Sequence, residues 1–338
     1  GPRMALQPRQ KAVYTLPYNF ASLNPKDEVF VKVQFLLGHD MPWAKQGYPQ
    51  FEEQLLVASP SVAAPAISQV AENAGKLEVS ADADKAFQTI KGEGFEVQFD
   101  MQQGTINKLV YGGESVIVPG YGPRLNAFRA FVSNDNWCYQ PWFANGLHNL
   151  KHHAENAQVI KEKNGNVKIT CTVVSQAPNA ARLQSKNGRY DSGIHTLEEN
   201  TDRPFGADDF KFTTNQIWTI YPDGSIELQA AITSNNPGIV LARLGYEMGV
   251  PAQYDRFAYY GRGPVDNYND RKTGQFIEQF SSTVAEQFTN WPKPQQMGNH
   301  EATRWTSLCN AKGKGILVVN EKPYAVSALN HSAMDMTM

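Results

Sequence analysis

The sequence has no apolar stretch of about 18 residues, so it predicts no membrane-spanning helix. Its first residues contain no apolar core of the kind that a secretory signal needs, and the compartment stays undecided. An excess of one charge is lacking too, because 31 basic residues oppose 33 acidic ones, for a net charge of −2. A chain with so little net charge lacks the excess of positive charge that binds nucleic acid or an anionic membrane, and we expect neither as a partner.

Cysteine is scarce. Cys138, Cys171 and Cys309 lie far apart and form neither a CxxC pair nor the spacing of a zinc site. The sequence therefore argues against a disulfide framework, and we expect each cysteine to pack as a small apolar side chain.

Three histidines lie close together along the chain. His148 and His152 have the i, i+4 spacing of a metal-binding pair on a helix. No third ligand is placed beside them, so we predict that they and His153 lie on a solvent-exposed surface and that this segment binds no metal.

Helical periodicity is also scarce, with Pro141–Leu150 as the best short candidate for a helix. Period-two alternation of apolar and polar residues recurs instead, most clearly in Glu28–Leu37, Phe95–Phe99 and Val167–Val173. Successive side chains of a strand point to opposite faces, so this alternation predicts half-buried strands of antiparallel sheets.

Two further features complete the prediction of strands. Pro222-Asp223-Gly224 lies between the strand-like runs Ile217–Tyr221 and Ser225–Ile232, and it predicts a hairpin. Ala12–Leu16 has the composition of another strand. We therefore predict an all-β fold.

The clearest boundary is the segment 58–74, which is rich in Ala, Ser and Pro, lacks alternation and predicts an extended linker. Residues 1–57 before it suit a small β-sandwich with strands missing. Residues 75–338 after it suit a large β domain. Within that domain, Pro178–Asn215 shows little alternation, and we expect a long surface excursion with at most a minor hairpin.

The segment Tyr259–Gly274 (YYGRGPVDNYNDRKTG) is dense in Gly, Asp, Asn, Arg and aromatic residues. It is no phosphate-binding loop, because no Gly-Lys-Ser/Thr follows and Pro264 removes a backbone donor. Its arginines suit charge-assisted hydrogen bonds to Asp266 or Asp270 that hold a loop in place. Recognition of a sugar hydroxyl is the alternative role.

Three segments resemble, in chain order, the C-terminal region of family-2 β-galactosidases. Tyr259–Gly274 is similar to a Gly-Pro-x-Glu-Asn-Tyr-x-Asp-Arg motif, Pro123–Asn136 to an Arg-Ala-Pro-x-Asp-Asn-Asp stretch, and Trp291–Arg304 to Pro-x-Glu-x-Gly-Asn-Arg. The chain departs from these patterns at Phe131, Ser133, Asp266, Gln296 and His300. Because Gln296 and His300 replace an acid and an arginine, we expect no salt bridge between them.

The resemblance implies an immunoglobulin-like sandwich (1–57), a linker (58–74) and a large mutarotase-like antiparallel β-sandwich (75–338). The chain ends at Met338, after a predicted strand at Tyr324–Leu329, where the resemblance implies that further strands would follow.

The resemblance also implies the place of the chemistry. Retaining β-galactosidases use two carboxylates about 5 Å apart, and in this family both come from a (β/α)₈ barrel, which needs at least about 200 residues. No barrel pattern occurs in this sequence, so we expect no catalytic residue in it. The parent enzyme's Mg²⁺, and its Na⁺ where used, would be bound mainly by the missing barrel.

Partners and substrate contacts follow in the same way. A galactoside, the catalytic barrel and further copies of the parent enzyme are the implied partners. The segment from Asp135 through Asn136 and Trp137 to Asn145 is implied to lie near the active-site entrance. Trp137 or Trp142 would stack on a sugar ring, unless these rings are packed in the protein. The segment Tyr259–Gly274, which we call the marker loop, contributes Arg262, Asp266, Asn267, Asp270 and Arg271, with the structural role given above.

Two other functions stay open. A carbohydrate-binding module would act without the barrel. A free-standing aldose mutarotase would need a histidine and a glutamate facing each other across a groove, and the candidates are His195, His300, Glu247 and Glu301.

Overall fold

The computed structural model describes residues 4, 6–15, 19, 23–24, 26–59, 75–185 and 195–338. The chain divides into two compact units, 1–66 and 67–338. Most of the predicted linker 58–74 lies outside the described residues, so its boundaries stay a prediction. Within the described part, no helix is long and apolar enough to cross a membrane.

The described part of unit 1–66 contains one antiparallel pair of strands, β1 (Val29–Leu36) and β2 (Pro49–Ala58). The alternation in this region therefore predicts β1 correctly. Residues 12–15, where we predicted a strand, form none and are exposed, and Leu16 lies outside the described residues. Two strands do not make a sandwich, so the immunoglobulin-like assignment stays a prediction.

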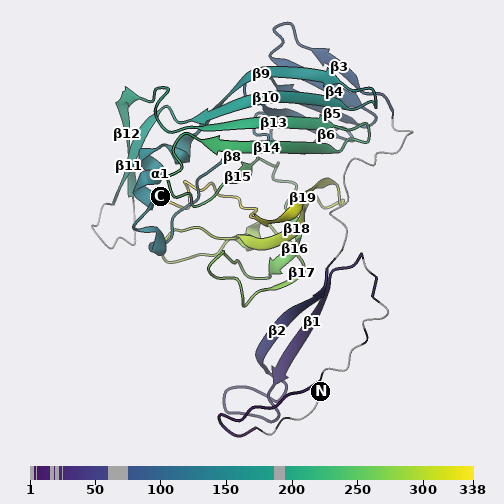
Figure 1. Cartoon of the computed structure of the whole chain (residues 1–338), viewed down its shortest axis with the longest axis vertical. Coiled ribbons are helices and arrows are strands. Elements are labelled where there is room, and N and C mark those ends of the chain that lie inside the picture. Colours follow the sequence, from purple (N-terminus) through teal and green to yellow (C-terminus); the bar gives the residue numbers. More distant parts are fainter. Residues whose placement is uncertain are drawn as a thin grey trace. The chain divides into compact units, whose positions relative to one another are not determined.

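Unit 67–338 is built around two sheets whose side chains share one core. The five-stranded sheet has the order β3-β4-β5-β6-β7 and the four-stranded sheet the order β14-β13-β10-β9 (Figure 1). Their bounds are β3 Glu78–Ala81, β4 Phe87–Gly92, β5 Phe95–Asp100, β6 Thr105–Tyr111, β7 Glu114–Ser115, β9 Lys151–Lys161, β10 Val167–Gln176, β13 Phe212–Ile220 and β14 Ile226–Ser234. The all-β prediction is confirmed.

Strand alternation places the core residues of these sheets. In β5, Phe95, Val97 and Phe99 are buried, and in β10 every second residue from Val167 to Ser175 is buried. The ring of Phe99 meets Trp218 of the facing sheet edge to face, with 5.7 Å between centroids. The predicted hairpin is also present, since β13 and β14 pair from Phe212↔Ser234 to Ile220↔Ile226.

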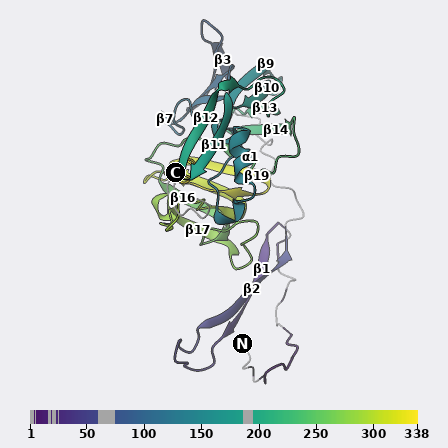
Figure 2. The ribbon, with the colours of Figure 1, turned by 90° about the vertical axis from the view of Figure 1, so that its left-hand side faces the viewer.

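Smaller sheets complete the unit. The third sheet has the order β17-β16-β18-β19, with β16 Arg256–Gly263, β17 Phe276–Thr283, β18 His300–Cys309 and β19 Gly315–Val326. Two pairs are β8 (Arg124–Asn126) with β15 (Gly245–Glu247), and β11 (Asn179–Ser185) with β12 (His195–Pro204). Figure 2 shows β11 and β12 beside helix α1 (Tyr139–Ala144). Short 3-10 turns lie at Ser133–Asp135 (η1), Leu147–Asn149 (η2) and Ala285–Gln287 (η3).

The prediction of a surface excursion over residues 178–215 is wrong in large part. It contains β11, β12 and the start of the central strand β13. Alternation in β13 is hidden because three of its buried residues are polar, Thr214, Gln216 and Thr219. Burial of Gln216 is possible because its amide oxygen accepts a hydrogen bond from the Trp218 indole at 2.8 Å, and its amide nitrogen donates to the Tyr246 hydroxyl at 3.2 Å.

The predicted helix at 141–150 is shorter and begins earlier. Gly146 separates α1 from η2 with a φ of +69°, and a Cβ at this position would lie 2.1 Å from that of Ala177. The prediction that three histidines form an exposed surface is wrong for His148 and His152. His148 lies in η2 against the ring of Phe143, His152 lies in β9, and burial lowers the pKa of both imidazoles to about 4.

Candidate functional site

The three segments that carry the family resemblance meet in the folded chain. We call the region formed by residues 123–136, 259–274 and 291–304 the motif junction. The first segment ends at residue 136 and the second begins at residue 259, so only the fold brings the first segment to the other two.

Hydrogen bonds join the second and third segments. The Asn267 amide N–H donates to the Asn299 carbonyl at 2.7 Å, and the Asn299 side chain donates to the Asn267 carbonyl at 2.7 Å. The side-chain oxygen of Asn267 accepts the Glu301 N–H at 2.9 Å, and Asp266 accepts the Gly298 N–H at 3.3 Å. Asn267 is fully buried, so its hydrogen bonds fix the position of the loop.

The marker loop is held by its arginines. Arg262 donates to the Gln275 carbonyl at 2.6 Å, and Arg271 lies 3.2 Å from the Asp266 carboxylate. Asp270 is exposed, and no ion pair joins it to another described residue. Of the two acids that we predicted as partners of these arginines, Asp266 is the one that is paired in the structure.

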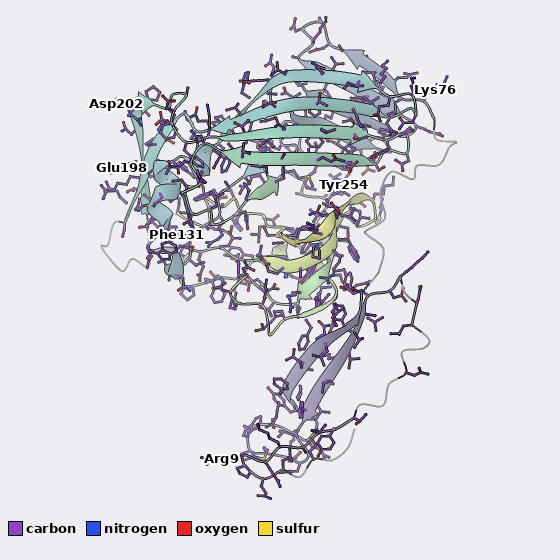
Figure 3. The ribbon with its side chains drawn as sticks, viewed as in Figure 1. Arg9, Lys76, Phe131, Glu198, Asp202 and Tyr254 are labelled. Carbon is purple, nitrogen blue, oxygen red and sulfur yellow. The ribbon has the colours of Figure 1, made fainter. Side chains whose placement is uncertain are left out.

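The first and third segments meet at Phe131, the position of which is labelled in Figure 3. The Lys293 ammonium lies 5.7 Å above the centre of the Phe131 ring. The same ring stacks on Tyr139, the first residue of α1, with 4.4 Å between centroids. The aromatic Phe131, where the family usually has proline, is therefore the contact between α1 and residues 291–304.

Asp135 is held by Arg129 of the same segment. The guanidinium contacts both carboxylate oxygens, at 2.6 and 3.0 Å, and the Val132 N–H donates to the carboxylate at 2.7 Å. Both side chains are largely buried. The Arg129 guanidinium also lies 5.4 Å from the Trp142 ring centre. The carboxylate of Asp135 is therefore engaged in an ion pair, whereas the neighbouring Asn136 is exposed.

The two candidate tryptophans differ sharply in exposure. Trp137 is 74% exposed, whereas Trp142 is 1% exposed and donates its indole N–H to the Val240 carbonyl at 2.8 Å. Trp142 offers no free face to a sugar in this structure, because its ring is enclosed in the core. Trp137 and Asn136 are the candidates that remain accessible.

The segment that follows Trp137 borders a hollow of about 620 Å³. It is lined by Gln140, Pro141, Ala144 and Asn145 on the side of α1, and by Ala181 and Arg182 of β11. The stretch from Asp135 to Asn145 therefore includes both an exposed aromatic ring and one wall of a concave surface.

Arg243 is a residue of this region that sequence reasoning missed. Burial, and then the charge of Arg129, lower the pKa of its guanidinium, while Tyr268 and Glu247 act in the opposite direction. No hydrogen bond or ion pair joins its side chain to any other described residue. The only sequence signal was a lone charge inside the apolar run Ile239–Leu244.

Of the residues that a mutarotase would need, His300, Glu247 and Glu301 contact residues other than one another. The His300 ring donates its Nε2–H to the Gln287 side-chain oxygen at 2.6 Å and stacks on Tyr259 at 4.2 Å. Glu247 accepts from Asn126, and Glu301 lies 3.7 Å from the Lys272 ammonium. His195 packs edge to face on Phe131, at 5.3 Å.

A metal site has no basis in the described residues, which contain no group of three or more His, Cys, Asp or Glu side chains that could hold an ion.

Comparison with known families agrees with this arrangement. Residues 91–338 match the family described as "Beta galactosidase small chain", and residues 2–58 match "Beta-galactosidase, domain 4". The chain belongs to the β-galactosidase small-chain family. Together the two matches identify a β-galactosidase C-terminal region, as the three motif segments implied.

Full-length β-galactosidases are similar over most of this chain. That of Priestia megaterium is 25% identical over 313 residues, 93% of this chain and 26% of the relative. That of Halalkalibacterium halodurans is 25% identical over 97% of this chain and 29% of its own length. β-Galactosidase BgaC of Bifidobacterium adolescentis is 23% identical over 91% and 26%. The chain thus spans little more than a quarter of these relatives.

Proposed function

We propose that this chain is the non-catalytic C-terminal part of a retaining, family-2 β-galactosidase that hydrolyses terminal β-D-galactosides. In that enzyme it supports the catalytic barrel and shapes the mouth of the active site. The observation that carries the proposal is the state of the acids in the motif junction. Asp135 is paired with Arg129 and Asp266 with Arg271, whereas the ring of Trp137 beside them is exposed.

Retaining hydrolysis needs one carboxyl as acid and base and another as nucleophile, on either side of the glycosidic bond. The carboxylates of Asp135 and Asp266 are each engaged by a guanidinium, so we assign neither of them such a role. The relatives are more than three times as long as their match to this chain, which leaves ample length for a barrel of about 200 residues or more. Any Mg²⁺ or Na⁺ of the parent enzyme would be bound mainly there.

Contact with substrate falls to Asn136 and Trp137 in this proposal. The face of an indole suits the C–H face of galactose, and a loop that carries it at the edge of a rigid scaffold is a usual place for a binding residue. The marker loop (Arg262, Asp266, Asn267, Asp270, Arg271) holds residues 291–304 in place and contacts no substrate.

The first experiment is an assay of the 338-residue chain with a chromogenic β-galactoside. We expect no hydrolysis above that of a blank. Turnover that follows the protein through purification would show that catalytic carboxylates lie within this chain and would overturn the proposal. Addition of the catalytic part as a second polypeptide should give activity that depends on both.

A carbohydrate-binding module is the second candidate, and the exposed ring of Trp137 favours it. Calorimetry of the chain with galactose and lactose separates the two functions. Saturable binding at millimolar sugar by the chain alone would favour the module, because the mouth of an active site has little affinity without its barrel.

A further inference from the structure

A second concave site lies in unit 67–338, outside the motif junction. It is a pocket of about 350 Å³ between the turn after β5, the strand β8 and the start of β9. β9 is the last strand of its sheet (Figure 1), so the pocket lies at a sheet edge. The polar residues that line it are Gln102, Gln103, Arg124, Lys151, His152 and His153.

The lining carries two permanent positive charges and no carboxylate. Two acids next to the lining are engaged by other groups: Asp100 accepts the backbone N–H groups of Gln102 and Gln103 at 2.8 and 2.9 Å, and Glu247, opposite Arg124 in the strand pair, accepts from Asn126. No ion pair joins Arg124 or Lys151 to any other residue in the described part of the chain.

The charges of Arg124 and Lys151 both act on the imidazole of His152. Burial, and then the charges of Arg124 and Lys151, lower the pKa of His152 to about 4. The His152 Nδ1 lies 2.8 Å from the hydroxyl of Ser175, which is fully buried. In the tautomer in which Ser175 donates to Nδ1, the neutral ring has an N–H at Nε2 as a further donor.

The position of the guanidinium is fixed before any ligand binds. Arg124 donates to the backbone carbonyls of Gly120 and Gly122, and its guanidinium lies 5.0 Å from the centre of the Tyr121 ring. An arginine that is oriented by backbone carbonyls and not paired with a carboxylate keeps its positive charge. Some of its N–H groups also stay available to bind a ligand.

We propose that this pocket binds a small oxyanion, either the carboxylate of an acidic sugar or a phosphate. The chemistry is the same for both: Arg124 and Lys151 supply the charge, and the side-chain amides of Gln102 and Gln103 supply neutral donors to the remaining oxygens. The volume is sufficient for a monosaccharide-sized ligand, at the lower end of small-molecule sites. The site does not depend on the barrel or on the proposed function.

The test is calorimetry of the whole chain at constant ionic strength, with inorganic phosphate, glucuronate and, as the neutral control, glucose. We expect saturable millimolar binding of phosphate, glucuronate or both, and none of glucose. Binding of phosphate alone identifies a phosphate site, and binding of glucuronate alone identifies an acidic-sugar site. Absence of binding by both anions, or equal binding of glucose, overturns the proposal.

Substitutions of Lys151 test whether the anion binds in this pocket. Lys151→Met should weaken binding by roughly tenfold, the effect of one charge-assisted hydrogen bond, and Lys151→Glu should abolish it. Lys151 is exposed, so both variants should keep the melting temperature. The matched control is Lys312→Met, the same change at an exposed lysine outside the pocket. Equal affinities of the wild type and Lys151→Glu would refute the site.

Discussion

Arg129 binds both carboxylate oxygens of Asp135, at 2.6 and 3.0 Å, with most of both side chains removed from water. Because bidentate pairs of this kind fix geometry as well as charge, they hold the turn from which Trp137 projects. The turn is thus anchored by a pair only six residues apart in sequence, and the indole two residues beyond Asp135 is left exposed.

Replacement of Asp135 should therefore destabilise the chain. Asp135→Asn keeps the shape but leaves Arg129 partly buried without a counter-charge, so we expect a loss of about 2–3 kcal/mol in the free energy of unfolding. Urea denaturation measures it. The control Asp270→Asn, at an exposed acid of the marker loop, should change the free energy by less than about 0.5 kcal/mol. Equal losses for the two variants would contradict the role given to the Arg129 pair.

Substitution of the two tryptophans should have different effects, on stability for Trp142 and on catalysis by the longer enzyme for Trp137. Trp142→Ala opens a cavity in the core and leaves the Val240 carbonyl unpaired, so it should cost about 3–5 kcal/mol of unfolding free energy. Trp137→Ala should cost less than about 0.5 kcal/mol. In the longer enzyme, Trp137→Ala should lower kcat/KM for a galactoside by roughly 3- to 10-fold, the value of one stacking contact, and Trp137→Phe should restore most of it. Unchanged kinetics for Trp137→Ala would remove this residue from the active-site mouth.

Arg243 should be dispensable for stability in this chain. Its charged form is penalised by burial and by Arg129, and the opposing effect of Tyr268 and Glu247 does not outweigh that penalty. Arg243→Met should leave the free energy of unfolding unchanged or raise it by up to about 1 kcal/mol. Arg129→Met, which removes a paired arginine of similar burial, should lower it by about 2 kcal/mol. A loss of similar size in both variants would mean that Arg243 has a partner within the chain.

Acid should weaken the fold through two histidines. His148 and His152 have a folded-state pKa of about 4, below their ordinary 6.5. Since the unfolded chain binds these protons more readily, the stabilisation is complete above pH 6.5 and is lost as the pH falls from 6.5 toward 4. Each ring contributes at most about 3 kcal/mol to this dependence.

Urea denaturation between pH 7.5 and 4.5 measures that dependence. His148→Leu should flatten it, because the ring is replaced by an apolar group between Phe128 and Phe143, where both imidazole nitrogens lack a partner among the described residues. His39→Gln, at an exposed histidine, should leave the pH dependence unchanged. If His148→Leu also leaves it unchanged, the histidine is not buried as described.

The sequence by itself determined the all-β fold and its main strands. Phe95, Val97 and Phe99 alternate with polar residues because one face of β5 is buried and the other is not, and that rule is local. The turn at Pro222-Asp223-Gly224 is local too, so the hairpin of β13 and β14 could be predicted from a dozen residues. The same rule missed the first half of β13, where the polar Thr214 and Gln216 occupy core positions and Gln216 is hydrogen-bonded to Trp218 and to Tyr246 of another strand.

Tertiary structure alone decided the rest of the candidate site. Trp137 and Trp142 have the same side chain and lie five residues apart, yet one is exposed and the other is sealed under the loop that carries Val240. Arg243 and Arg129 act on each other although 114 positions separate them. Burial and charge at such positions depend on which distant segments pack together, and no local pattern of residues encodes that.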